Sequence, residues 1–391
     1  MTGNADLRTR VPGAPLRAPS LQNQYLPALT GLRFALALWV IMHHLTGKNM
    51  LLEHWAQTLP SAMQSILRGG YLAVQTFFLL SGFVLAQSYA ATRWNRDSLM
   101  RFAIARFART YPAYLLSLGL ISWFAFEFAL KPGRTMGQKA VVLGDYALLL
   151  QGWTGSLAVG WNTPAWSLSC EFFFYLCFPL LFLWLRGGRM GRTLLALGGS
   201  LVTPILLAHA GVPTDWKPIH HLSDFLAGIA AAGIYNAIAR TGFAPKWLGA
   251  AMYLSALTGG AAFIVYPHVL DGTLMNLNTV LRPLNVALLI GLALGGGLLG
   301  RALASDAAGY LGKASYSMYI LHIPLLWWFS RYTSYRFGTA PPAWAGLLFI
   351  ALVIAASIGA FEFVETRSNQ WIRDWAAARM KPAAPKVLCA A

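Results

Sequence analysis

Long apolar runs are the feature that most constrains this chain. A helix needs about 20 predominantly apolar residues to cross the hydrocarbon core of a bilayer, whereas only 11% of these 391 residues are charged, against about 25% in soluble domains. The sequence therefore predicts an all-α membrane protein. Eleven candidate runs occur, at residues 28–47, 70–91, 111–130, 140–152, 171–186, 193–210, 220–239, 247–266, 280–300, 314–330 and 342–364.

Arginines predict which connections between the runs face the cytosol. Five lie between Arg93 and Arg109, before the third run, and three lie between Arg186 and Arg192. Both clusters can be cytosolic, as the positive-inside rule predicts, only if one run between them does not cross. The shortest run, 140–152, is therefore predicted to be a re-entrant or interfacial segment. About ten transmembrane helices remain, with both termini cytosolic and with Lys131, Arg134 and Lys139 outside.

This topology divides the chain into three parts. We expect a disordered cytosolic tail over residues 1–25, a transmembrane domain over 26–365 and a basic cytosolic tail over 366–391. The net charge of +17, from 30 basic and 13 acidic residues, would suggest nucleic acid in a soluble protein. Here the arginines lie between apolar runs, so we expect a lipid bilayer as the partner and no nucleic acid.

Few ionisable residues lie inside the runs, and each is costly there. Arg33 and His44 are eleven residues apart on the first run, which places them within about 20° of the same helix face and roughly 16 Å apart along the axis. His43 points about 80° away from that face. A histidine in this position is either a hydrogen-bonding residue between helices or a functional group, and the co-facial Arg33 favours function.

Other polar residues flank the later runs. Arg106 and Arg109 lie one turn apart at the start of the third run, where they either anchor the helix or form an anion site together with Arg33. Glu171 follows Ser167 and Ser169, which are expected to cap the fifth helix and to leave Glu171 in its first turn. His322 follows Tyr319 by one turn and either bridges helices or takes part in function.

Two further patterns are rejected as ligand sites. His220, His221 and Asp224 have the residue types of a metal site, but His220 and Asp224 supply only two ligands where three or four are needed. We therefore expect no metal. Gly295, Gly296 and Gly297 lack the lysine of a phosphate-binding loop. Cys170 and Cys177, about 10 Å apart on one helix, are too distant for a disulfide.

Five motifs in order resemble the acyltransferase 3 family of membrane O- and N-acyltransferases and cover most of positions 26–365. They are LTGLRFALALWVIMHHL, GYLAVQTFFLLSGFVLA, RFAIARFARTYPAYL, NTPAWSLSCEFFFYLCFPLL and LGKASYSMYILHIPLL. The family's conserved positions fall on Arg33 and His44, on Ser81–Phe83 for its SGF turn, on Arg106 and Arg109, on Trp166–Glu171 and on Ser315–His322. This chain departs from the family pattern at Gln75, where many members are acidic, at Cys170, where valine is usual, and at Thr366, where proline is usual.

The resemblance implies transfer of an acyl group, most often acetyl from acetyl-CoA, to a hydroxyl of an envelope glycan or another exported carbohydrate at a bacterial inner membrane. The CoA phosphates would bind at the cytosolic mouth to Arg33, Arg106 and Arg109, and His44 would act as general base or acyl relay. Glu171 and His322 are further candidate catalytic residues. Trp166, Ser167 and Tyr319 are expected to bind substrate.

Two other classes of protein fit some of these features. A polytopic transporter or flippase for an anionic or glycan substrate would also need a cavity with Arg, His and Glu side chains. Repeat symmetry between its halves would then be expected, and the five motifs are not arranged in that way. A purely structural membrane subunit is disfavoured by the co-facial Arg33 and His44.

Overall fold

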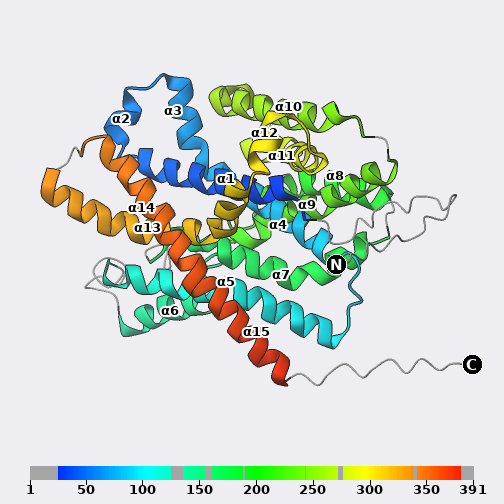
Figure 1. Cartoon of the computed structure of the whole chain (residues 1–391), viewed down its shortest axis with the longest axis horizontal. Coiled ribbons are helices and arrows are strands. Elements are labelled where there is room, and N and C mark those ends of the chain that lie inside the picture. Colours follow the sequence, from blue (N-terminus) through cyan, green and yellow to red (C-terminus); the bar gives the residue numbers. More distant parts are fainter. Residues whose placement is uncertain are drawn as a thin grey trace, which may run out of the picture.

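The computed structural model describes residues 25–124, 135–154, 161–187, 190–242, 244–271, 276–337 and 341–379. These residues are almost entirely helical and contain no strand (Figure 1). The helices are α1 (Pro27–Thr46), α2 (Glu53–Gln57), α3 (Ser61–Arg68), η1 (Gly69–Leu72), α4 (Ala73–Ser88), α5 (Arg96–Phe124), α6 (Met136–Ala147), η4 (Thr163–Ala165), α7 (Trp166–Leu185), α8 (Met190–His209), α9 (Lys217–Arg240), α10 (Lys246–Val265), η5 (Pro267–Leu270), α11 (Leu277–Leu294), α12 (Gly297–Leu303), α13 (Asp306–Phe337), α14 (Trp344–Ala360), the π-helical turn η6 (Phe361–Thr366) and α15 (Arg367–Arg379).

The prediction of an all-α membrane protein is confirmed. Eight helical segments of the described chain are long and apolar enough to cross a bilayer. The helices α5 and α13, with 29 and 32 residues, are less apolar but longer than a bilayer requires. They contain most of the predicted runs 111–130 and 314–330, so together with the eight segments they account for the ten expected spans.

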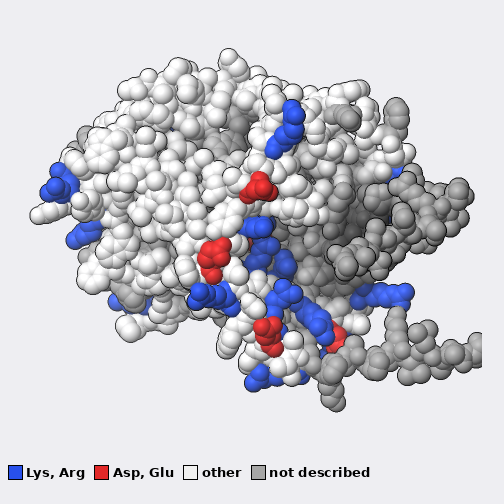
Figure 2. Space-filling view, viewed as in Figure 1, with Lys and Arg blue, Asp and Glu red and all other residues white. Residues whose placement is uncertain are grey.

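The outer surface of the bundle is suited to lipid. Leucines project from several spanning helices and are largely exposed, among them Leu176 and Leu180 of α7, at 78% and 74%, and Leu347 of α14, at 71%. Figure 2 shows one face of the molecule, on which charged residues gather along α15 while the area over α14 is mostly uncharged. Exposing apolar side chains to water is unfavourable, so these exposed leucines support a multi-pass membrane protein.

The length of α6 supports the prediction that this segment does not cross the membrane. Its 12 residues extend over about 18 Å, less than the roughly 30 Å of a hydrocarbon core. A guanidinium nitrogen of Arg186, after α7, donates to the carbonyl of Thr92, before α5, at 2.7 Å. The two arginine-rich connections therefore lie on the same face, as they must if α5 and α7 cross and α6 does not. Lys131, Arg134 and Arg189 are outside the described residues.

This arrangement predicts the outcome of cysteine labelling. In a variant without its native cysteines, Met136→Cys should react with an impermeant maleimide added outside intact cells, because Met136 is the first residue of the non-spanning α6 and is 78% exposed. Met190→Cys, which follows α7 and is 43% exposed, should react only after the cells are opened. The reverse pattern would place the arginine-rich connections outside.

Close packing of α4 against α9 holds the centre of the bundle together. A Cβ at Gly82 would lie 2.2 Å from the carbonyl oxygen of Phe225, and one at Gly228 would lie 1.9 Å from that of Leu79. Only glycine permits this backbone contact. The expected SGF turn at Ser81–Phe83 is therefore wrong, because these residues form the middle of α4.

The end of the chain continues the bundle as a helix. The π-helical turn η6 joins α14 to α15, and α15 packs against α5, as its course across α5 in Figure 1 shows. The first residues of the expected basic tail, 367–379, are thus helical. Residues 1–24 and 380–391 lie outside the described part of the chain.

Candidate active site

Two neighbouring cavities lie beside α1, one next to Arg33 and the other next to His44. The Arg33 cavity has a volume of about 70 Å³ and is also lined by Glu171, Ser167 and Tyr316. The His44 cavity has about 290 Å³ and is also lined by Trp166 and His221. Tyr319 and Val74 line both. The two cavities are therefore adjacent, separated by these two side chains.

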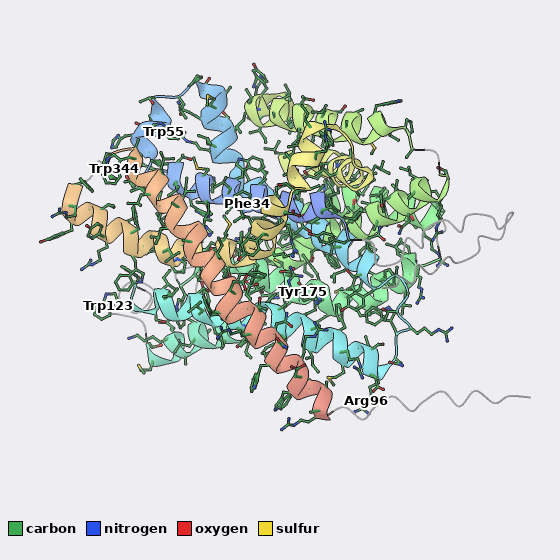
Figure 3. All side chains as sticks on the ribbon, viewed as in Figure 1. Phe34, Trp55, Arg96, Trp123, Tyr175 and Trp344 are labelled. Atoms are coloured by element: carbon green, nitrogen blue, oxygen red, sulfur yellow. The ribbon has the colours of Figure 1, made fainter. Side chains whose placement is uncertain are left out.

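Glu171 lies in the Arg33 cavity with two hydroxyl partners. The Tyr175 hydroxyl donates to its carboxylate at 2.5 Å, and the Ser81 hydroxyl donates to the same oxygen at 3.2 Å. Tyr175 lies near the centre of the molecule (Figure 3). Arg33 lies close enough to Glu171 for their charges to interact. The negative charge of the carboxylate is therefore partly balanced by a cation.

The predicted group of three arginines is present. Arg109 and Arg106, one turn apart on α5, are both electrostatic neighbours of Arg33. The Arg106 guanidinium lies 5.9 Å from the ring centres of Phe102 and Tyr175, and its buried Nε has no partner in the described chain. The group is therefore able to bind an anion, because guanidinium groups form charge-assisted hydrogen bonds to phosphate.

A second carboxylate, which sequence reasoning left outside the site, accompanies these arginines. Glu365 is buried in η6, accepts a hydrogen bond from the Ser317 hydroxyl, and has Arg109 and Arg33 as charged neighbours. Its place directly before Thr366, where the family usually has proline, was the only signal in the sequence. Glu365 and Glu171 offset part of the arginine charge, which lowers the cost of burying it.

Behind the cavity-lining His44 lies another histidine, from a different helix. The rings of His44 on α1 and His322 on α13 have centres 5.1 Å apart. His322 is fully buried, and its Nδ1 contacts the Tyr319 carbonyl at 2.6 Å. A carbonyl can only accept, so Nδ1 carries the proton and Nε2 has a free lone pair. This Nε2 is buried and has no partner in the described chain.

His43 is directed toward a neighbouring helix. Its Nδ1 donates to the carbonyl of Arg68 at the end of α3, at 2.5 Å, and its ring centre is 5.6 Å from that of Tyr71. His43 nevertheless also borders the His44 cavity. The Nδ1 atom of His43 thus helps to hold α1 to α3. His44 makes no such hydrogen bond to the backbone of the described residues.

The start of α7 differs from the expectation. The helix begins at Trp166, after the short η4, and none of its side chains caps its N-terminus. The Ser167 hydroxyl instead contacts the Pro164 carbonyl and the Tyr319 hydroxyl, each at 2.9 Å. The predicted caps at Ser167 and Ser169 are therefore wrong, and Glu171 lies in the second turn. This places Trp166 in one cavity and Ser167 in the other.

The residues rejected as a metal site form a hydrogen-bond network. Asp224 is buried, contacts His221 Nδ1 at 2.9 Å and Arg282 Nε at 2.6 Å, and accepts from Gln75 at 2.9 Å. His220 instead contacts the Pro213 carbonyl at 3.1 Å. The described residues contain no group of three or more His, Cys, Asp or Glu able to hold a metal ion.

These features define a class of protein before any comparison. Polar and ionisable side chains are gathered inside a bundle of spanning helices, with cations and a histidine pair at neighbouring cavities, and such groups within a membrane mark functional sites. Comparison with known families identifies the reaction class. The family model for the acyltransferase domain matches residues 26–361, so this chain belongs to the acyltransferase 3 family and is a membrane acyltransferase.

The chain is similar to several characterised relatives. It is 32% identical to the acyltransferase MdmB of Streptomyces mycarofaciens over 360 residues, covering 85% of this chain and 88% of MdmB. It is 22% identical to the peptidoglycan O-acetyltransferase OatA of Listeria monocytogenes, over 91% of this chain and 58% of OatA. The O-acetyltransferase OatA of Staphylococcus aureus is 24% identical over 88% of this chain and 57% of its own length. No solved structure matches the chain.

Proposed function

We propose that this protein transfers an acetyl or other acyl group from acyl-CoA to a hydroxyl of a cell-envelope or exported carbohydrate. We place it in a bacterial inner membrane with both termini in the cytosol. The observation that carries the proposal is the pair of cavities that share Tyr319 and Val74. One is lined by Arg33, which has Arg106 and Arg109 as charged neighbours and is suited to an anionic donor, and the other is lined by histidines suited to acid–base chemistry.

The donor would bind on the arginine side. CoA is a polyanion that cannot enter lipid, so its phosphates require cations at the cytosolic mouth, which Arg33, Arg106 and Arg109 supply. The Arg33 cavity of about 70 Å³ has room for a few water molecules only. We therefore expect the helices around it to separate when the pantetheine arm of the donor enters toward His44.

The chemistry would take place at His44. As a general base, His44 removes the proton from the acceptor hydroxyl while the hydroxyl oxygen attacks the thioester carbonyl. The carbon–sulfur bond then breaks, and the CoA thiolate takes the proton from His44. Alternatively, His44 first accepts the acyl group itself and passes it on. In either case the lone pair on His322 Nε2, whose ring centre is 5.1 Å from that of His44, can orient the His44 ring by accepting a hydrogen bond from its ring N–H.

The acceptor would occupy the His44 cavity. Its walls combine aromatic rings, such as Trp166, with neutral hydrogen-bonding groups such as Gln75, Asn278 and Thr163. Sugars present both apolar C–H surfaces and hydroxyl groups, so this combination suits a carbohydrate. One relative is named a peptidoglycan O-acetyltransferase, which supports a glycan acceptor here.

A direct assay tests the reaction. Purified protein in nanodiscs is supplied with radiolabelled acetyl-CoA and an envelope glycan fraction, and both glycan labelling and free CoA thiol are measured. We expect both products to appear together and to require the protein. If no thiol is released, and the same protein in sealed proteoliposomes moves the label across the membrane unchanged, the protein is a transporter.

The arginine group predicts the affinity for the donor. Arg106→Ala or Arg109→Ala should weaken acetyl-CoA binding by about 1.5 to 3 kcal/mol, because each removes a charge-assisted hydrogen bond. Lysine at either position should restore binding only in part, since it cannot form the bidentate contact. Binding is measured by calorimetry on the purified protein.

Arg101→Ala is the matched control, because Arg101 is exposed on the same helix. It should bind acetyl-CoA as the parent does. Parental affinity in both the Arg106 and Arg109 alanine variants, at normal abundance, would mean that these arginines only anchor α5.

A further inference from the structure

His221, contributed by α9, borders the His44 cavity together with His43 and His44. Its ring lies between two aromatic side chains, with centres 5.2 Å from the Phe78 ring and 5.4 Å from the Trp166 ring. Its side chain is 19% exposed, and it borders the cavity together with His44, Trp166 and Tyr319. The packing fixes the position of the ring at the cavity wall.

The network behind His221 fixes which nitrogen carries its proton. Asp224 Oδ2 lies 2.9 Å from His221 Nδ1, and an ionised carboxylate can only accept. Asp224 is 1% exposed and is itself paired with the buried Arg282, which cancels its charge. In the neutral ring, Nδ1 therefore donates to Asp224 and Nε2 has a free lone pair. This Nε2 makes no hydrogen bond to the described part of the chain.

The other interpretations of this cluster are weaker. A metal ion would need a third ligand, but His220 contacts the Pro213 carbonyl and one oxygen of Asp224 is engaged by Arg282 and Gln75. A purely structural role would require neither an unpartnered nitrogen nor a place on the cavity wall. A buried ring with a fixed tautomer and one available acceptor is instead suited to recognising a hydroxyl donor.

We infer that His221 is an acceptor-binding residue, whose Nε2 accepts a hydrogen bond from a sugar hydroxyl next to the one that reacts at His44. Asp224 acts through His221 as a positioning residue. This inference rests on the proposed function, because it assigns the acceptor side of the same reaction. The contact decides which hydroxyl of the carbohydrate faces His44, so it sets acceptor affinity and specificity without supplying the base.

The experiment compares His221→Phe with its neighbour His220→Phe. Phenylalanine preserves the packing of the ring between Phe78 and Trp166 and removes both nitrogens, while His220 does not border the His44 cavity. Initial rates are measured in nanodiscs with radiolabelled acetyl-CoA and serial dilutions of a solubilised envelope glycan fraction. His221→Gln is included because its amide oxygen can still accept a hydrogen bond.

For His221→Phe we expect the half-saturating glycan concentration to rise about tenfold, the effect of losing one good hydrogen bond. Half-saturation by acetyl-CoA and the rate at saturating glycan should stay within about twofold. His221→Gln should recover part of the affinity for the glycan, and His220→Phe should behave as the parent.

Two outcomes would overturn the inference while leaving the proposed function intact. One is an unchanged half-saturating glycan concentration in His221→Phe. The other is a collapse of the rate at saturating glycan with unchanged half-saturation, which would make His221 the base. If the parent itself labels no glycan, the proposed function is wrong and the inference falls with it.

Discussion

Alanine at His44 is expected to reduce acyl transfer by about 10² to 10⁴, the usual contribution of a general base. His44 borders the cavity assigned to the acceptor and lies beside the lone pair of His322. No other residue of α1 combines these two contacts. The variant should insert and accumulate normally, because the imidazole of His44 is partly exposed. Its removal leaves one neighbouring buried atom, His322 Nε2, without a hydrogen-bond partner, and this atom has no partner among the described residues of the parent either.

His43→Ala is the matched control for this prediction. His43 has the same side chain one position earlier, but its Nδ1 is bonded to the Arg68 carbonyl. We expect this variant to retain most of the transfer and to lose only some stability. Glycan labelling per unit of inserted protein is the measurement. Near-parental labelling by His44→Ala would move the chemistry to His322 or Glu171.

Apolar runs predicted the spanning helices well, because membrane insertion depends on a local property of each segment. They did not predict where α5 begins. Hydropathy placed the start of that span at residue 111, but the helix starts at Arg96 and continues past Pro112. Its first four turns contain four arginines among apolar residues, which lowers their mean hydropathy although they form the same helix.

The start of α7 was missed for a related reason. Serine residues before an apolar run are typical helix caps, but Thr163 and Pro164 already form the short η4 that leads directly into Trp166. The Ser167 hydroxyl is then free to contact Tyr319 of α13. Ser167 and Tyr319 are 152 residues apart in the sequence, so no local pattern of residues predicts their contact.

Long-range pairing also explains why the site residues were only partly found. The family motifs pointed to Arg33, His44, Arg106, Arg109 and Glu171, because each of these candidate site residues lies within a motif. His221 and Asp224 were tested only as metal ligands, a test that considers neighbours in sequence. Their partners are Gln75, 149 residues from Asp224, and Arg282, 58 residues from it.

Asp224→Ala is expected to lower the free energy of unfolding by about 3 to 5 kcal/mol, because it leaves a buried charge without its partner. Arg282 is 2% exposed and would retain only its hydrogen bond to the Ser200 carbonyl. Gln75 would also lose an acceptor inside the bundle. Unfolding of the purified protein by increasing sodium dodecyl sulfate in mixed micelles measures the loss. Asp215→Ala, at an exposed position, should change stability by less than about 0.5 kcal/mol.

The double variant Asp224→Leu with Arg282→Met separates the cost of the lone charge from loss of packing. Replacing a buried ion pair with apolar residues of similar volume is often neutral or stabilising, so this variant should regain most of the lost stability. It should still bind the glycan more weakly than the parent, since His221 Nδ1 would have no carboxylate to fix its tautomer. Parental stability in Asp224→Ala, or a double variant no more stable than the single one, would show that the pair does not hold α9 to α11.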